Sequence, residues 1–152
     1  MNLSKSYLNF CKKNNFEINI DQLNLVKELN NFYNINFKKS FLKKIFHQKK
    51  LKLGFYLQGD VGVGKTMILN FFFEQINEKK LKLHFNEFML SFHDFVHERK
   101  VKSGENVINQ FVKELKLKAS LIYFDEFQVT NIVDAMILGK LFDQIFKENI
   151  KI

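Results

Sequence analysis

The apolar positions of this chain change period several times, and each change predicts a change of secondary structure. Spacings of three and four residues place side chains on one helix face, and they predict helices at about 21–33, 67–77, 88–98, 107–115 and 131–146. Short apolar or alternating runs predict strands at 53–57, 81–85 and 121–124. Because strands alternate with helices, the pattern favours parallel pairing, right-handed crossovers and an α/β fold.

Polar residues at the helix starts refine these bounds. Asp21 is predicted to cap the first of these helices, and Thr130 or Asn131 the last. Residues 1–20 have no clear period, and we expect a short helix and a connector there. On the last helix the side chains expected to be buried are Val133, Met136, Ile137, Leu141, Phe142, Ile145 and Phe146.

Composition places the chain among globular proteins. Its 152 residues allow one domain, and 46% hydrophobic with 15% aromatic residues argues against disorder. Cys11 is the single cysteine, so an internal disulfide is excluded. Neither a run of about 20 apolar residues nor an apolar signal core is present. We therefore expect a soluble, cytoplasmic protein.

The chain has a net charge of +8, and its lysines are densest in one segment. Residues 38–52 interleave seven lysines with apolar residues, which predicts an amphipathic basic helix. Its lysines either form a solvated face above a packed apolar face, which is the favoured interpretation, or a patch that binds lipid or nucleic acid.

A glycine-rich segment follows the strand predicted at 53–57. It fits the phosphate-binding pattern G-x-x-x-x-G-K-[ST] at Gly59, Gly64, Lys65 and Thr66. The glycines allow positive φ, so that backbone N–H groups and a helix N-terminus face a polyphosphate. Lys65 is expected to reach the β and γ phosphates and Thr66 to ligate Mg²⁺. The expected ATP contacts are Gly59, Asp60, Val61, Gly62, Val63, Gly64, Lys65, Thr66 and Met67. The alternative is a turn kept for packing alone.

Two carboxylates end the strand predicted at 121–124. Parallel strands end at one edge of a sheet, so Asp125 is expected to meet the phosphate loop and hold Mg²⁺. Glu126 is expected to orient or deprotonate the attacking water. An ordinary Asp-Glu turn is the alternative. A second constellation, His93 and His97, is a near miss to the H-E-x-x-H zinc pattern, and partly exposed helix histidines are the favoured interpretation.

Two stretches carry a resemblance to a known family. HFNEFML at 84–90 and FDEFQVTNIVDAMIL at 124–138 resemble the ZapE-type ATPases of bacteria and the mitochondrial lactation-elevated proteins, which belong to the AAA+ class. The resemblance covers residues 20–152. It implies Mg²⁺-dependent ATP hydrolysis, with Lys65 and Glu126 catalytic, by a ring-type homo-oligomer peripheral to the inner membrane. It also links the protein to a division protein or to a protein substrate in quality control.

The chain departs from the family pattern at Val63, Asn86 and Asn131, where the family has Arg, His and Asp. None of these three side chains is an expected phosphate or Mg²⁺ ligand. By resemblance, residues 148–152 begin a further strand that lies between the strands at 53–57 and 121–124, and an arginine finger would follow later. The only arginine, Arg99, precedes Asp125, where no finger is expected.

The resemblance also raises a question about Phe88. AAA+ proteins carry a pore loop between the second strand and its helix, where an apolar side chain grips a polypeptide. Phe88 lies at that place, and a core position is the alternative interpretation.

We therefore expect a helical extension at 1–50 and, at 51–152, an incomplete P-loop AAA+ domain truncated after the helix that follows Asp125. The first function hypothesis is an ATPase, with weak turnover because loss of the finger costs roughly 10³-fold. The second is a non-catalytic nucleotide-binding module that docks on intact subunits. A phosphotransferase is disfavoured, because Glu126 beside Asp125 suits water activation.

Overall fold

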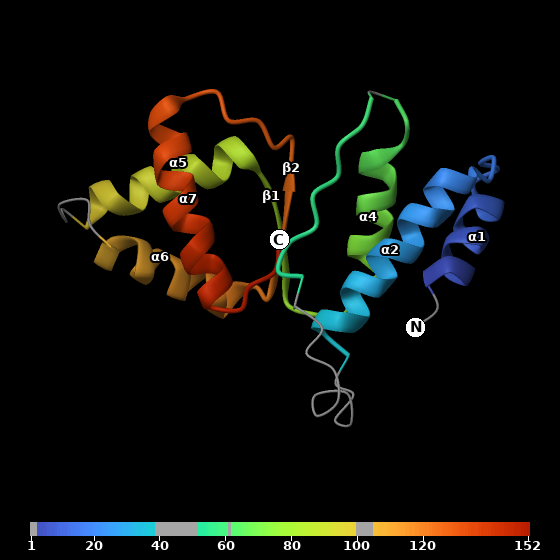
Figure 1. Cartoon of the computed structure of the whole chain (residues 1–152), viewed down its shortest axis with the longest axis horizontal. Helices are drawn as coiled ribbons and strands as arrows, with labels where there is room; N and C mark the ends of the chain where they lie inside the picture. Colours follow the sequence, from blue (N-terminus) through green and yellow to red (C-terminus); the bar gives the residue numbers. More distant parts are fainter. Residues whose placement is uncertain (1–2, 39–51, 61, 100–104) are drawn as a thin grey trace. The chain divides into compact units, whose positions relative to one another are not determined.

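The computed structural model describes residues 3–38, 52–60, 62–99 and 105–152 (Figure 1). The chain forms two compact units, Met1–Ile76 and Asn77–Ile152. The basic helix predicted at 38–52 falls almost entirely outside the described residues. The same holds for the predicted boundary between residues 50 and 51, which therefore stays a prediction.

The unit Met1–Ile76 contains α1 (Leu3–Lys13), α2 (Ile20–Asn36) and α4 (Lys65–Gln75). Aromatic rings join α1 and α4: the centroid of the Phe71 ring lies 5.2 Å from those of both Tyr7 and Phe10. The buried apolar residues of this unit come from all three helices and the residue after α4: Leu3, Tyr7, Cys11, Val26, Leu29, Phe32, Ile68, Phe71, Phe72 and Ile76. The helices predicted at 21–33 and 67–77 from the spacing of apolar residues are therefore confirmed.

Asn19, not Asp21, caps α2. The Oδ1 atom of Asn19 accepts hydrogen bonds from the backbone N–H groups of Asp21, at 2.8 Å, and Gln22, at 3.4 Å. Asp21 instead lies in the first turn, where a carboxylate also suits the helix dipole. Apolar spacing could not decide between them because both residue types cap helices well.

The strand predicted at 53–57 is wrong: residues 52–60 take neither helical nor strand conformation. Burial nevertheless alternates along this segment: Leu53, Phe55 and Leu57 are half-buried, and Gly54 and Tyr56 are exposed. The Phe55 ring lies 5.9 Å from the Phe32 ring of α2. An alternating pattern therefore places side chains here without a β-ladder, which needs a neighbouring strand as well.

The unit Asn77–Ile152 is built on two parallel strands, β1 (Lys80–His84) and β2 (Leu121–Asp125), paired in register from Lys80 opposite Leu121 to His84 opposite Asp125. The crossover contains α5 (Phe85–Glu98) and α6 (Glu105–Lys118), and α7 (Ile132–Lys147) follows β2. This confirms the α/β pattern predicted for residues 81–146.

The residues after α7 return to β2. Lys151 forms a parallel bridge with Leu121, and the N–H of Ile122 donates to the carbonyl oxygen of Lys151 at 2.8 Å. The predicted further strand therefore begins next to β2, on the opposite edge from β1.

Figure 1 shows α5, α6 and α7 on one side of the two strands, where they enclose the core of this unit. Phe88 lies within α5 and is 0% exposed, and its ring centroid is 4.8 Å from that of Phe124. The pore-loop interpretation of Phe88 is therefore wrong, because α5 begins directly after β1 and turns this side chain into the core.

Asn131 caps α7, as one of the two predicted candidates, by accepting a hydrogen bond from the N–H of Val133 at 2.8 Å. Leu141 and Ile145 are fully buried as expected, but Val133 and Met136 are 57% and 74% exposed. Apolar spacing shows which residues share a helix face, and it does not show how far the neighbouring elements reach along it. No helix in the described ranges is long and apolar enough to cross a lipid bilayer.

Candidate functional site

The phosphate loop, residues 59–66, has the expected positive φ at two of its glycines and not at Gly59. Gly62 and Gly64 have φ of 88° and 85°, a region that side-chain-bearing residues rarely adopt. Gly64 caps α4, and its carbonyl oxygen accepts from the N–H of Ile68 at 3.0 Å. The loop therefore enters a helix N-terminus directly, which is the backbone arrangement that suits an anion.

Lys65 folds back over this loop. Its Nζ donates to the carbonyl oxygen of Gly59 at 2.7 Å and also to that of Asp60. Both of these acceptors are neutral, and a charged oxygen makes a stronger hydrogen bond with an ammonium group. Lys65 is therefore placed to exchange carbonyl oxygens for phosphate oxygens. Thr66 lies exposed in the first turn of α4, so its hydroxyl is accessible to a ligand.

A side chain of α2 contacts the same loop. Gln22 Nε2 donates to the carbonyl oxygen of Val63 at 3.1 Å, and Gln22 Oε1 accepts from the hydroxyl of Tyr7 at 2.8 Å. Sequence reasoning missed both residues, because no local spacing links a position on α1 or α2 to a loop about forty residues away.

Asp125 is the last residue of β2, and its side chain is 17% exposed. The hydroxyl of Tyr123 donates to Asp125 Oδ1 at 3.3 Å, and Lys82 Nζ lies 3.2 Å from Oδ2. Burial and the neighbouring Asp125 carboxylate raise the pKa of Tyr123 above its ordinary value, so the phenol stays a hydrogen-bond donor. The carboxylate is thus oriented from two sides.

Lys82 and Tyr123 were also missed, although a signal for them existed. In the parallel register Lys82 lies opposite Tyr123 and His84 opposite Asp125. Residues two apart in a strand share a face of the sheet. Alternate residues of the two predicted strands lie on the same face as Asp125. With the strand register as well, this pattern would have placed Lys82 and Tyr123 beside Asp125.

Glu126 leaves the strand with a φ of 52°, in the left-handed region. Such a conformation is unfavourable for a residue with a side chain, and backbone strain of this kind clusters at functional sites. The residue is exposed. The chain therefore leaves the direction of β2 at an exposed Glu126, and the role of this residue toward water stays a prediction.

The predicted site residues fall into two groups. Residues 59–67, of which Val61 lies outside the described part, belong to the unit Met1–Ile76, and Asp125 and Glu126 belong to the unit Asn77–Ile152. That the two groups form one site stays a prediction. Their chemistry fits a nucleoside triphosphate with Mg²⁺: positive-φ glycines and an ammonium group for phosphate, and a hydroxyl and a carboxylate for the metal.

Arg99 is engaged within its own unit. Its Nη1 donates to Gln110 Oε1 at 3.1 Å, its Nη2 pairs with Glu114, and its guanidinium lies 4.3 Å from the centre of the Phe95 ring. These contacts tie the C-terminal end of α5 to α6. They give the only arginine of the chain a structural role.

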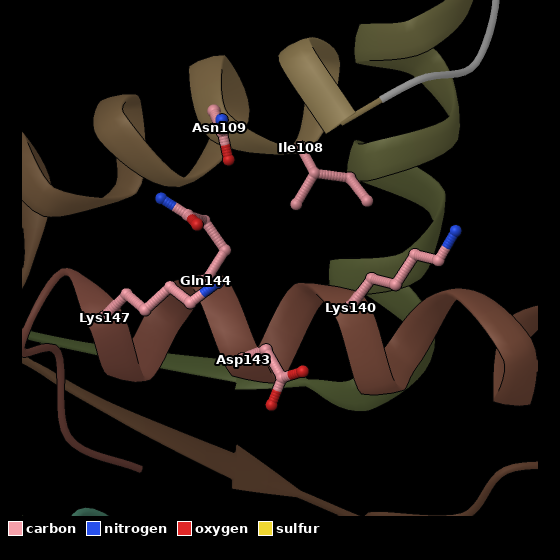
Figure 2. A pocket seen from close by; sticks show the side chains of 6 residues that line it. All are labelled: Ile108, Asn109, Lys140, Asp143, Gln144 and Lys147. Atoms are coloured by element: carbon pink, nitrogen blue, oxygen red, sulfur yellow. The ribbon is translucent and has the colours of Figure 1, made fainter.

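Two other places were considered as sites. His93 Nε2 lies 2.8 Å from Asp134 Oδ1, and the described residues contain no group of three or more His, Cys, Asp or Glu that could hold a metal ion. A hollow of about 160 Å³ between α6 and α7 appears in Figure 2. It is smaller than typical ligand pockets of roughly 300–1,000 Å³, and it contains none of the predicted site residues. Its lining residues are Ile108, Asn109, Lys140, Asp143, Gln144 and Lys147.

The chain is similar to known proteins over most of its length. A family model described as AFG1-like ATPase matches residues 2–152. The chain is 39% identical over 104 residues to Lactation elevated protein 1 homolog B of Danio rerio, covering 62% of this chain and 21% of that protein. It is 35% identical over 98 residues to Cell division protein ZapE of Escherichia coli (strain K12), covering 64% of this chain and 26% of that protein. The chain thus spans about a quarter of the length of these relatives. No solved structure matches it.

Proposed function

The chain belongs to the AFG1-like ATPase family, and on this premise we propose that it binds ATP with Mg²⁺ at the phosphate loop. The family supplies the reaction class, and the chain supplies the groups. We assign phosphate binding to the backbone N–H groups of residues 59–67 and to Lys65. Asp60, Val61, Val63 and Met67 contribute through the backbone.

One observation carries the proposal: the ammonium group of Lys65 lies against the carbonyl oxygens of Gly59 and Asp60, over a loop with two glycines at positive φ. A loop kept for packing alone needs the glycines and has no use for an ammonium group at this position. The carbonyl acceptors of Lys65 are neutral. A triphosphate would offer this ammonium group negatively charged oxygens as acceptors instead.

For hydrolysis we assign the metal ligands to Thr66 and Asp125 and the general base to Glu126. When bound, Mg²⁺ neutralises charge on the phosphate oxygens. Asp125 is oriented for that task by Tyr123 and Lys82. Glu126, exposed and in the left-handed region, accepts the proton of the attacking water.

A second candidate function is a nucleotide-binding module without appreciable turnover, and one observation favours it for this chain alone. Arg99 is the only arginine and is engaged by Gln110 and Glu114. An arginine finger contributes roughly 10³–10⁵ to kcat in related phosphoryl transfers. Fast turnover therefore needs an arginine from outside these residues.

We extend the proposal to the whole protein only through its relatives. A homo-oligomeric ring would supply that arginine from a neighbouring subunit. The named relative ZapE is a cell division protein, and we propose a related role in division or protein quality control. A cytoplasmic location with peripheral membrane association fits this proposal.

The test measures ATP binding and ATP turnover with Mg²⁺ on this chain and on a longer form of the protein that includes the remaining family segments. Binding in both, with turnover only in the longer form, is the expected result. Binding without turnover in both favours the nucleotide-binding module. Absence of binding in both contradicts the proposal.

A further inference from the structure

Tyr7 and Gln22 form a hydrogen-bonded chain that ends on the phosphate loop. The ring of Tyr7 is 0% exposed and packs against Phe71, with 5.2 Å between the ring centroids. Its hydroxyl is therefore held by the core of the unit Met1–Ile76. It donates to Gln22 Oε1 at 2.8 Å, and this leaves the Gln22 amide group to donate to the carbonyl oxygen of Val63 at 3.1 Å.

The bond to Val63 constrains the next residue as well. A peptide group is planar and trans, so the carbonyl of Val63 and the N–H of Gly64 point in opposite directions. The carbonyl is held toward Gln22. The N–H of Gly64, a donor expected to face phosphate, is therefore held away from α2.

Gly64 also makes room for this contact. A Cβ atom at Gly64 would lie 2.8 Å from Gln22 Nε2 and 3.7 Å from Gln22 Cδ. The Gln22 amide thus lies directly against the loop backbone, and a larger residue at position 64 would displace it. The glycine serves both the positive φ of 85° and the approach of Gln22.

We propose that Gln22 is a positioning residue for the phosphate loop, and that Tyr7 acts through it by orienting its amide. The inference rests on the proposed function, since it assigns these residues to the same ATP site. Gln22 contacts the loop backbone and not the nucleotide. It lowers the cost of ordering the loop around a triphosphate, because the Val63–Gly64 peptide is already oriented before the ligand arrives.

Three variants test this positioning role. Gln22→Met keeps the side-chain length and helix propensity but removes both hydrogen bonds. Tyr7→Phe removes only the hydroxyl, and it leaves the packed ring in place. Asn31→Met changes an exposed residue of the same helix and is the matched control. Each is measured for the Kd of Mg·ATP, for the amide resonance of Gly64 without nucleotide, and for the midpoint of urea unfolding.

The expected loss follows from the worth of one hydrogen bond. Gln22→Met raises the Kd about 2- to 10-fold and shifts the Gly64 amide resonance before nucleotide is added. Tyr7→Phe gives a smaller change in the same direction. The double variant binds no more weakly than Gln22→Met alone, because Tyr7 acts only through Gln22. Asn31→Met behaves like the wild type.

Other results overturn the inference. A Gly64 resonance and a Kd that stay at their wild-type values in Gln22→Met refute it, as does a double variant whose loss is the product of the two single losses. Should Gln22→Met fail to fold, Tyr7→Phe still decides through the Gly64 resonance. If the wild type binds no nucleotide, the proposed function fails, whereas the nucleotide-free resonance still tests whether Gln22 positions the loop.

Discussion

The phosphate loop presents backbone groups, whereas the end of β2 presents side chains. In the loop, conformation comes from glycines at positive φ and from the turn into α4. At the end of β2, Asp125 is oriented by Tyr123 and Lys82, and Glu126 is placed by a left-handed backbone. The first region depends mainly on local sequence, with one side-chain contact from Gln22 of α2, and the second depends on a register between strands far apart in the chain.

This difference bears on how each region responds to substitution. The loop glycines tolerate few substitutions, because only a residue without a Cβ atom readily adopts positive φ and lets another group approach the loop backbone closely. At the strand end, the ladder of β1 and β2 holds the backbone of Asp125 when a neighbouring side chain is changed, and only the orientation of its carboxylate responds. Substitutions can therefore separate binding, which we assign mainly to the loop, from hydrolysis, which we assign to the carboxylates.

The largest expected effect belongs to the strand end. Glu126→Gln removes the general base while keeping size and polarity, so turnover by a form of the protein that hydrolyses ATP falls roughly 10²–10⁴-fold. The Kd for ATP stays unchanged. Steady-state turnover and equilibrium binding measure the two effects, with Glu98→Gln, an exposed residue of α5, as the control. Retained turnover in Glu126→Gln would remove the base role from this residue.

The next effect belongs to the loop. Lys65→Ala removes the ammonium group that we assign to phosphate, and the Kd for Mg·ATP rises about 10- to 100-fold, as expected for a hydrogen bond with a charged group. A fluorescent ATP analogue measures the binding. Lys12→Ala, at an exposed lysine of α1, should bind like the wild type. Equal weakening by both variants would show that the effect is one of general charge.

Glycine substitutions are expected to change the free energy of unfolding by a smaller amount, and the direction of the change differs between two positions. Gly64→Ala forces a side chain into a left-handed conformation and against Gln22, and we expect a loss of about 1–2 kcal/mol in the free energy of unfolding. Gly139→Ala, in α7, adds a Cβ with no atom within 4 Å beyond its chain neighbours and the adjacent helix backbone, and it should gain about 0.5–1 kcal/mol in the free energy of unfolding. Urea unfolding compares the two. A stabilised Gly64→Ala variant would contradict the assigned loop geometry.

The smallest effect concerns the ion pair at β2. Lys82 is partly exposed, and under the proposed assignment its charge would compete with a metal ion for Asp125. Lys82→Met should lower the Mg²⁺ concentration needed for half-maximal ATP binding, by at most about 5-fold, since exposed ion pairs contribute little. A Mg²⁺ titration at constant ATP measures this, with Lys79→Met, just before β1, as the control. A raised Mg²⁺ requirement would show that Lys82 assists metal binding.

Much of the fold was predictable, because it follows from local periodicity. The spacing in α5, α6 and α7 marked these helices, and the apolar run ending at Asp125 marked β2. The failures involve tertiary structure. Residues 53–57 carry a strand pattern without a ladder, Phe88 lies in a helix that starts earlier than expected, and Met136 lies on a part of α7 that is exposed.

The candidate site divides in the same way. The positive φ of Gly64, a required glycine of the phosphate-binding pattern, could be predicted, whereas Gly62 has positive φ at a variable position and the required Gly59 does not. Gln22 and Lys82 could not be predicted, because their roles depend on how α2 packs beside the loop and how β1 aligns with β2. Glutamine and lysine are common on protein surfaces, so their residue type alone does not mark them as site residues.

The most direct test of the central claim is a titration of the ¹⁵N-labelled chain with Mg·ATP, followed by the amide resonances of its glycines. Our account predicts that Gly59, Gly62 and Gly64 shift together and saturably, while Gly139 in α7 does not, and that Lys65→Ala weakens this response. Glycine resonances that stay in place at saturating Mg·ATP, or that shift no more in the loop than at Gly139, would contradict it.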